Sequence, residues 1–129
     1  MIAPLKTDDW IIKAEHDLEA ATLLFEQTTN YDIVVYHAHQ AVEKTMKWFL
    51  LKHEVKFPFV HDLILINELV DPLLKMHLNI QDLAYLNKLL PNTRYPLGDW
   101  IEFDQAKKAL EIATSVCDYL RIDFFDGSK

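Results

Sequence analysis

The stretch Tyr36-His-Ala-His-Gln-Ala-Val-Glu-Lys-Thr-Met-Lys-Trp48 decides the fold, because it is a periodic run without glycine or proline near the middle of the chain. The periodicity extends on both sides and predicts a helix from Ile33 to about Lys52. At 100° per residue, its apolar side chains cover well over a third of the circumference, more than the stripe of a typical surface helix. We therefore expect this helix to lie at the centre of the fold.

A narrow polar band remains on the predicted central helix, and its members follow the spacing that aligns side chains on one helical face. They are Tyr36, His37, Gln40, Lys44 and Lys47. The simplest interpretation is a solvated stripe with a Glu43–Lys47 ion pair beside it. The alternative is a surface that is directed at a ligand.

The size and composition of the chain limit the possible fold classes. The chain has 129 residues, of which 50% are apolar and 26% are charged, as in an ordinary soluble single domain. It contains two glycines, and its five prolines stand at segment ends. Long uninterrupted runs with so few turn residues predict an all-α protein with short connections. We expect one domain over residues 7–125, with short tails at 1–6 and 126–129.

The net charge, the N-terminal sequence and the single cysteine indicate which partners the protein has and in which cellular compartment it lies. The formal net charge is −7, so the overall field would not attract nucleic acid, and no DNA binding is expected. The N-terminus lacks a signal-peptide pattern, and no uncharged stretch is long enough to cross a membrane. The single cysteine, Cys117, lies on an apolar helix face and is expected in the core. These features predict a cytoplasmic protein without membrane contact.

Caps and prolines mark the ends of the other predicted helices. Thr7 is expected to cap a helix that ends around residues 28–30, and Asp104 is expected to cap the last helix. Two further segments lie between the central and last helices: 61–70, which Asp71-Pro72 stops, and about 79–90, which Pro91 ends.

Two apolar residues of the last predicted helix lie away from its core stripe. Ile112 and Tyr119 are seven residues apart, which places them on one face roughly opposite that stripe. A single exposed apolar residue is common, but an aligned pair indicates a second packing partner. We therefore expect these residues to be exposed and to support a homodimer.

Several kinds of site are excluded by spacing. His37 and His39 are two residues apart, so on a helix their side chains diverge by about 200° and cannot share an ion. The chain contains no Glu-x-x-His pair and no cysteine cluster, so no metal is expected. Two glycines are too few for a phosphate-binding loop or a dinucleotide fingerprint, and no cofactor is expected.

The order of the remaining pieces resembles the HEPN family (higher eukaryotes and prokaryotes nucleotide-binding domain) over about residues 7 to 125. The pieces are Trp10 with Ala14 and Asp17-Leu18, then His39-Gln40-Ala41-Val42-Glu43-Lys44 with Lys47, then His61-Asp62-Leu63, then Arg94-Tyr95-Pro96. The resemblance implies an up-and-down four-helix bundle with an additional short helix, commonly dimeric. Family members often act beside a small nucleotidyltransferase in two-gene toxin–antitoxin systems, and some are metal-independent ribonucleases.

The chain departs from the ribonucleases of this family at their catalytic motif. Those enzymes use an arginine followed, after four to six intervening residues, by a histidine. Arg94 is followed at these offsets by Asp99, Trp100 and Ile101, and Arg121 has no histidine after it. We therefore predict no catalytic residues.

A set of polar residues remains as a candidate binding site for a nucleotide of the ATP or GTP type, or for another anion. They are His37, Gln40, Lys44, Lys47, His61 and Arg94. Lysine and arginine supply charge-assisted donors, and Arg94 lies in the turn-rich loop 91–98. We expect Arg94 and Lys44 to approach a common cleft. The alternative is that Lys44 pairs with Asp17 or another acid and that Arg94 only fixes its loop.

Three functions are compatible with these observations. The first is a non-catalytic nucleotide-binding or partner-binding HEPN homodimer that works with a nucleotidyltransferase in a toxin–antitoxin-type pair. The second is a metal-independent ribonuclease with a non-standard pair, such as His37 or His61 with Arg94. The third is an interaction module without a ligand.

Overall fold

The computed structural model describes residues 6–95 and 99–127, and within them the chain is helical with no strand. The elements are α1 (Thr7–Gln27), α2 (Tyr31–Lys52), α3 (Leu63–Val70), η1 (Asp71–Leu73), α4 (Ile80–Leu89), η2 (Leu90–Thr93) and α5 (Phe103–Gly127). The all-α fold is therefore confirmed. None of the described helices combines the length and the apolar character needed to cross a membrane.

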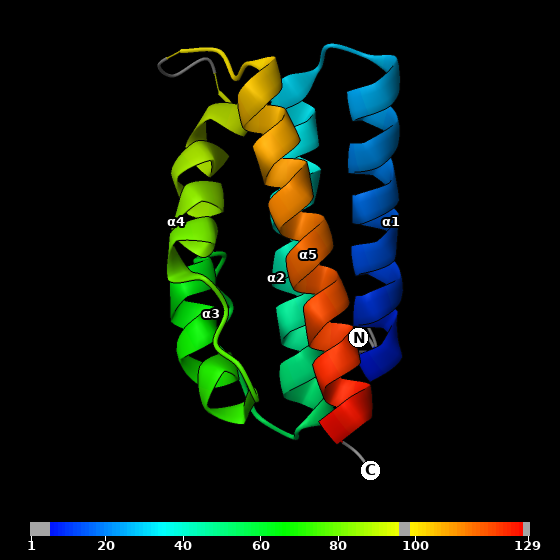
Figure 1. Ribbon diagram of the computed structural model, residues 1–129, viewed down its shortest axis with the longest axis vertical. Coiled ribbons are helices and arrows are strands. Elements are labelled where there is room, and N and C mark those ends of the chain that lie inside the picture. The colour runs from blue at the N-terminus through cyan, green and yellow to red at the C-terminus, as the bar shows by residue number, and fades with distance from the viewer. Residues whose placement is uncertain (1–5, 96–98, 128–129) are drawn as a thin grey trace, which may run out of the picture.

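The long helices form an up-and-down bundle, as Figure 1 shows. α1 and α4 run in one direction along the long axis, and α2 and α5 run in the other. The short α3 is the additional helix, and it shares one side of the bundle with α4. α2 packs against α1, α3, α4 and α5, so it is the central helix that its wide apolar surface predicts.

Two predicted caps are displaced by one or two residues. α1 is capped by Lys6 rather than Thr7, and the backbone N–H of Lys6 donates to Asp9 Oδ2 at 3.0 Å. α5 begins at Phe103, so Asp104 lies in its first turn and favours the positive end of the helix dipole. The carbonyl of Glu102, the residue before the first residue of α5, already accepts a helical hydrogen bond from the N–H of Ala106.

Side-chain caps begin the two shorter helices. Asp62 accepts hydrogen bonds from the backbone N–H groups of Ile64 and Leu65 at the start of α3. Asn79 accepts one from Gln81 at the start of α4. Both helices continue into 3₁₀ turns that contain a proline, which is where the sequence predicts that they stop.

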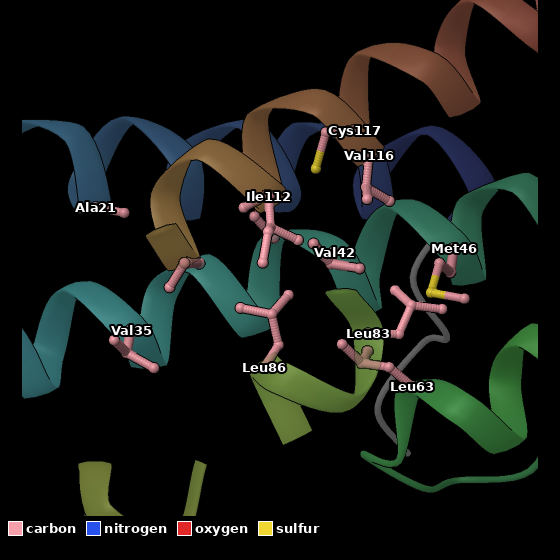
Figure 2. Close-up of a cluster of buried hydrophobic side chains, with 14 of the residues drawn as sticks. Ala21, Val35, Val42, Met46, Leu63, Leu83, Leu86, Ile112, Val116 and Cys117 are labelled. Carbon is pink, nitrogen blue, oxygen red and sulfur yellow. The ribbon is translucent and has the colours of Figure 1, made fainter. Parts of the chain in front are cut away.

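The core lies between α2 and the helices around it (Figure 2). Its buried apolar side chains come from every α-helix; those labelled are Ala21, Val35, Val42, Met46, Leu63, Leu83, Leu86, Ile112, Val116 and Cys117. The expected core position of Cys117 is confirmed, since the residue is 3% exposed, and burial raises the pKa of its thiol to about 11. The thiol is therefore protonated at neutral pH and is a poor nucleophile.

The expectation that Ile112 and Tyr119 are exposed is wrong. Ile112 is 6% exposed and belongs to the core cluster. The Tyr119 hydroxyl donates to the carbonyl of Met76 at 2.8 Å and accepts from its N–H at 2.9 Å. The segment before α4 therefore contacts Tyr119, and the core of the same chain encloses Ile112. The pair gives no evidence for a second chain.

Candidate functional site

One part of the polar band of α2 faces a carboxylate of α1. Asp17 is 9% exposed, and its Oδ2 accepts a hydrogen bond from Lys44 Nζ at 2.6 Å. Its Oδ1 accepts from His37 Nδ1 at 2.8 Å. Lys44 therefore has the alternative arrangement that the sequence allowed, in which it pairs with Asp17. Its charge is compensated inside the protein rather than directed at a ligand.

The other part of the band surrounds Glu43, whose side chain is 4% exposed. Lys47 Nζ donates to Glu43 Oε2 at 2.9 Å. Two groups donate to Oε1: His61 Nδ1 at 2.9 Å and Gln40 Nε2 at 3.3 Å. A buried carboxylate is costly unless such donors compensate it. Glu43 thus ties two positions of α2 to the end of the loop before α3.

Lys47 lies inside the bundle. Its ammonium group is 5.7 Å from the ring centroid of Trp10 and 5.5 Å from that of Phe57. The residue is 4% exposed, so the two rings and Glu43 enclose the charge. Lys47 was expected to bind a ligand, but the structure places it where a ligand has no access.

The contact with Glu43 fixes the ring of His61. An ionised carboxylate only accepts hydrogen bonds, so the contacting Nδ1 of His61 carries a hydrogen. Nε2 has no hydrogen-bond partner among the residues that the structure describes. The side chain is 60% exposed, which leaves this edge of the ring available.

His61 and Arg94 meet at one cleft of about 340 Å³. Its other lining residues are Leu90, Pro91 and Tyr95. The Arg94 guanidinium lies 5.2 Å from the ring centroid of Tyr36, a cation–π contact with the first part of α2. No carboxylate of residues 6–95 or 99–127 forms an ion pair with Arg94.

The six predicted residues therefore divide into three groups. His61 and Arg94 line the cleft. His37 stacks on Tyr36 with 5.4 Å between ring centroids, which places it next to the contact of Arg94, and Gln40 is buried at 7% exposure. Lys44 and Lys47 are held by carboxylates. Pro96 of the Arg94-Tyr95-Pro96 motif lies outside the described residues.

Asn87, which joins three helices, was not among the residues that the sequence pattern indicated. Its Oδ1 accepts from the backbone N–H of Leu63 at 3.1 Å and lies 3.2 Å from His39 Nε2. Its Nδ2 donates to Asp62 Oδ1 at 2.8 Å. Asn87 therefore links α2 and α4 to the start of α3, next to His61. A lone asparagine in an amphipathic helix has no spacing pattern that would identify this role.

His39 is a buried neutral histidine in this arrangement. Nε2 donates to Asn87, while Nδ1 is buried without a hydrogen-bond partner, 3.9 Å from Glu43 Oε1. Burial lowers the pKa of His39 below its ordinary value of 6.5. The His39 ring therefore has a structural role. Among the described residues, no three His, Cys, Asp or Glu side chains are close enough together to hold a metal ion.

The comparisons with known proteins agree with this architecture. The sequence matches the HEPN domain family over residues 7–123, so the chain belongs to the HEPN family. The fold is similar to that of TT1696 from Thermus thermophilus, with a TM-score of 0.75, 20% identity, and coverage of 91% of this chain and 97% of that one.

A second solved structure with the same fold is ST0689, an archaeal HEPN homologue. It is 19% identical with a TM-score of 0.67, and the match covers 92% of this chain and 97% of that one. No curated protein matches the chain significantly. At these identities the two structures establish the fold.

Replacing Glu43 tests the buried network. The Glu43→Gln variant should lose about 3 to 5 kcal/mol of unfolding free energy, because Lys47 keeps its charge in a buried position without a carboxylate. Urea denaturation followed by circular dichroism measures the change. The matched control is Glu15→Gln, which removes an exposed pair with Arg121 and should cost less than about 1 kcal/mol. Equal losses in the two variants would contradict the burial argument.

Proposed function

We propose that this chain is a non-catalytic, nucleotide-binding HEPN protein whose ligand lies in the cleft of His61 and Arg94. The observation that carries the proposal is the convergence of His61, Arg94 and Tyr95 on one cleft of about 340 Å³. Small-molecule sites in proteins combine apolar walls with a few polar groups in clefts of about this size. A nucleotide has a planar base for the apolar wall and a phosphate for the polar groups.

Each wall of the cleft matches one part of a nucleotide. Leu90, Pro91 and the ring of Tyr95 supply apolar surface for a base. The Arg94 guanidinium can bind two phosphate oxygens at once, and its planar fork suits that geometry. Tyr36 holds the guanidinium from one face without neutralising its charge. The cation is therefore available.

The absence of the ribonuclease motif supports the non-catalytic part of the proposal. Neither Arg94 nor Arg121 has a histidine at the offsets that HEPN ribonucleases use. Arg121 instead pairs with Glu15 at 3.1 Å on another face of the bundle. Because Arg121 lies away from the cleft, its replacement is a control for the loss of an arginine side chain in the binding experiment.

Isothermal titration calorimetry with ATP and GTP tests the proposal. The wild-type chain should bind at least one of them at millimolar concentration or below. Arg94→Ala should weaken binding at least tenfold, because a charge-assisted phosphate contact is lost. Arg121→Ala should leave binding unchanged. The proposal fails if wild type binds neither these triphosphates nor AMP, or if Arg94→Ala binds as well as wild type.

A second candidate function, metal-independent ribonuclease activity, is favoured by one contact. Glu43 orients His61 through Nδ1 at 2.9 Å, which leaves Nε2 as a proton acceptor beside Arg94. A histidine oriented by a carboxylate is a common general base. This arrangement would let His61 accept a proton from an RNA 2′-hydroxyl while Arg94 binds the phosphate.

Incubation with single-stranded RNA in the presence of a chelator separates the two functions. The non-catalytic proposal predicts no cleavage above that of a buffer control. Cleavage that disappears in both His61→Ala and Arg94→Ala, and persists in Arg121→Ala, would establish the ribonuclease function instead.

We also propose that the protein is a cytoplasmic homodimer that works with a nucleotidyltransferase in a toxin–antitoxin-type pair. Membership of the HEPN family supports both the homodimer and the nucleotidyltransferase partner. A nucleotidyltransferase gene beside the gene for this chain would support the second of these. α1 exposes Ile12 and Leu23, which are eleven residues apart and lie on one face. Light scattering at micromolar concentration should give twice the mass of one chain. A monomer at that concentration would contradict the dimer.

A further inference from the structure

The polar band of α2 offers a ligand less positive charge than its sequence implies. Lys44 Nζ is 2.6 Å from Asp17 Oδ2, and Lys47 Nζ is 2.9 Å from Glu43 Oε2. Both carboxylates are largely buried, with side chains 12% and 4% exposed. A phosphate that recruited either lysine would leave a buried carboxylate without its counterion, which is strongly unfavourable.

The formal charges of the two buried ion pairs, of Asp62 and of Arg94 cancel. The carboxylates are Asp17, Glu43 and Asp62, and the cations are Lys44, Lys47 and Arg94. Asp62 adjoins His61 in sequence and accepts hydrogen bonds from the backbone N–H groups of Ile64 and Leu65 in α3. The whole chain carries a formal net charge of −7. Phosphates beyond the one at Arg94 would therefore face negative charge without a further cation.

We infer that the cleft selects a nucleotide with a single phosphate, a nucleoside 5′-monophosphate, over a triphosphate. The inference rests on the proposed function and adds the class of nucleotide. Arg94 is the one cation lining the described cleft, and one guanidinium binds one phosphate in a bidentate manner. A cleft of about 340 Å³ is also near the lower end of the range for small-molecule sites.

Calorimetric titration with AMP, ADP and ATP in the presence of a chelator tests the inference on the wild-type chain. AMP should bind at least threefold more tightly than ATP, with ADP between them, because each added phosphate meets uncompensated negative charge. An ATP affinity equal to or above that of AMP would overturn the inference and leave the proposed function standing. Binding of none of the three would overturn both.

Discussion

The buried carboxylate of Glu43 is the group on which both the bundle and the cleft depend. A carboxylate at 4% exposure is tolerated only when donors surround it. Lys47, one turn later on α2, supplies the opposite charge, and His61 supplies a hydrogen bond from the loop before α3. The need to compensate Glu43 therefore fixes where that loop ends. The same contact orients the ring that forms one wall of the cleft.

Charge compensation also decides how much positive charge the polar band of α2 leaves unpaired. A helix with Lys44 and Lys47 on one face would ordinarily attract anions. Here the neighbouring element α1 contributes Asp17, and α2 itself contributes Glu43, so both lysines form ion pairs within the protein. Arg94 stays outside this system because it lies in the chain after η2 and rests on an aromatic ring. The positive charge available to a ligand is thus concentrated at one guanidinium.

Local rules were sufficient to predict the helices, whereas burial depended on distant segments. Periodicity and proline positions locate α2 and the ends of α3 and α4, because those signals act within a few residues. The burial of Ile112 could not be judged this way, since it depends on packing against core side chains of other helices. The sequence likewise does not reveal that Trp10 and Phe57 enclose Lys47, because each aromatic residue comes from a different part of the chain.

The cleft is held in position before any ligand arrives. Asn87 bonds to Asp62 and Leu63 at the start of α3 and faces His39 of α2. A shift of α4, and of η2 after it, relative to α2 would break these contacts, two of which are partly buried. The position of Arg94 relative to His61 is therefore coupled to these hydrogen bonds. For the nucleotide that we propose, a site preorganised in this way loses little conformational entropy on binding, so a single phosphate contact can contribute most of its interaction energy to affinity.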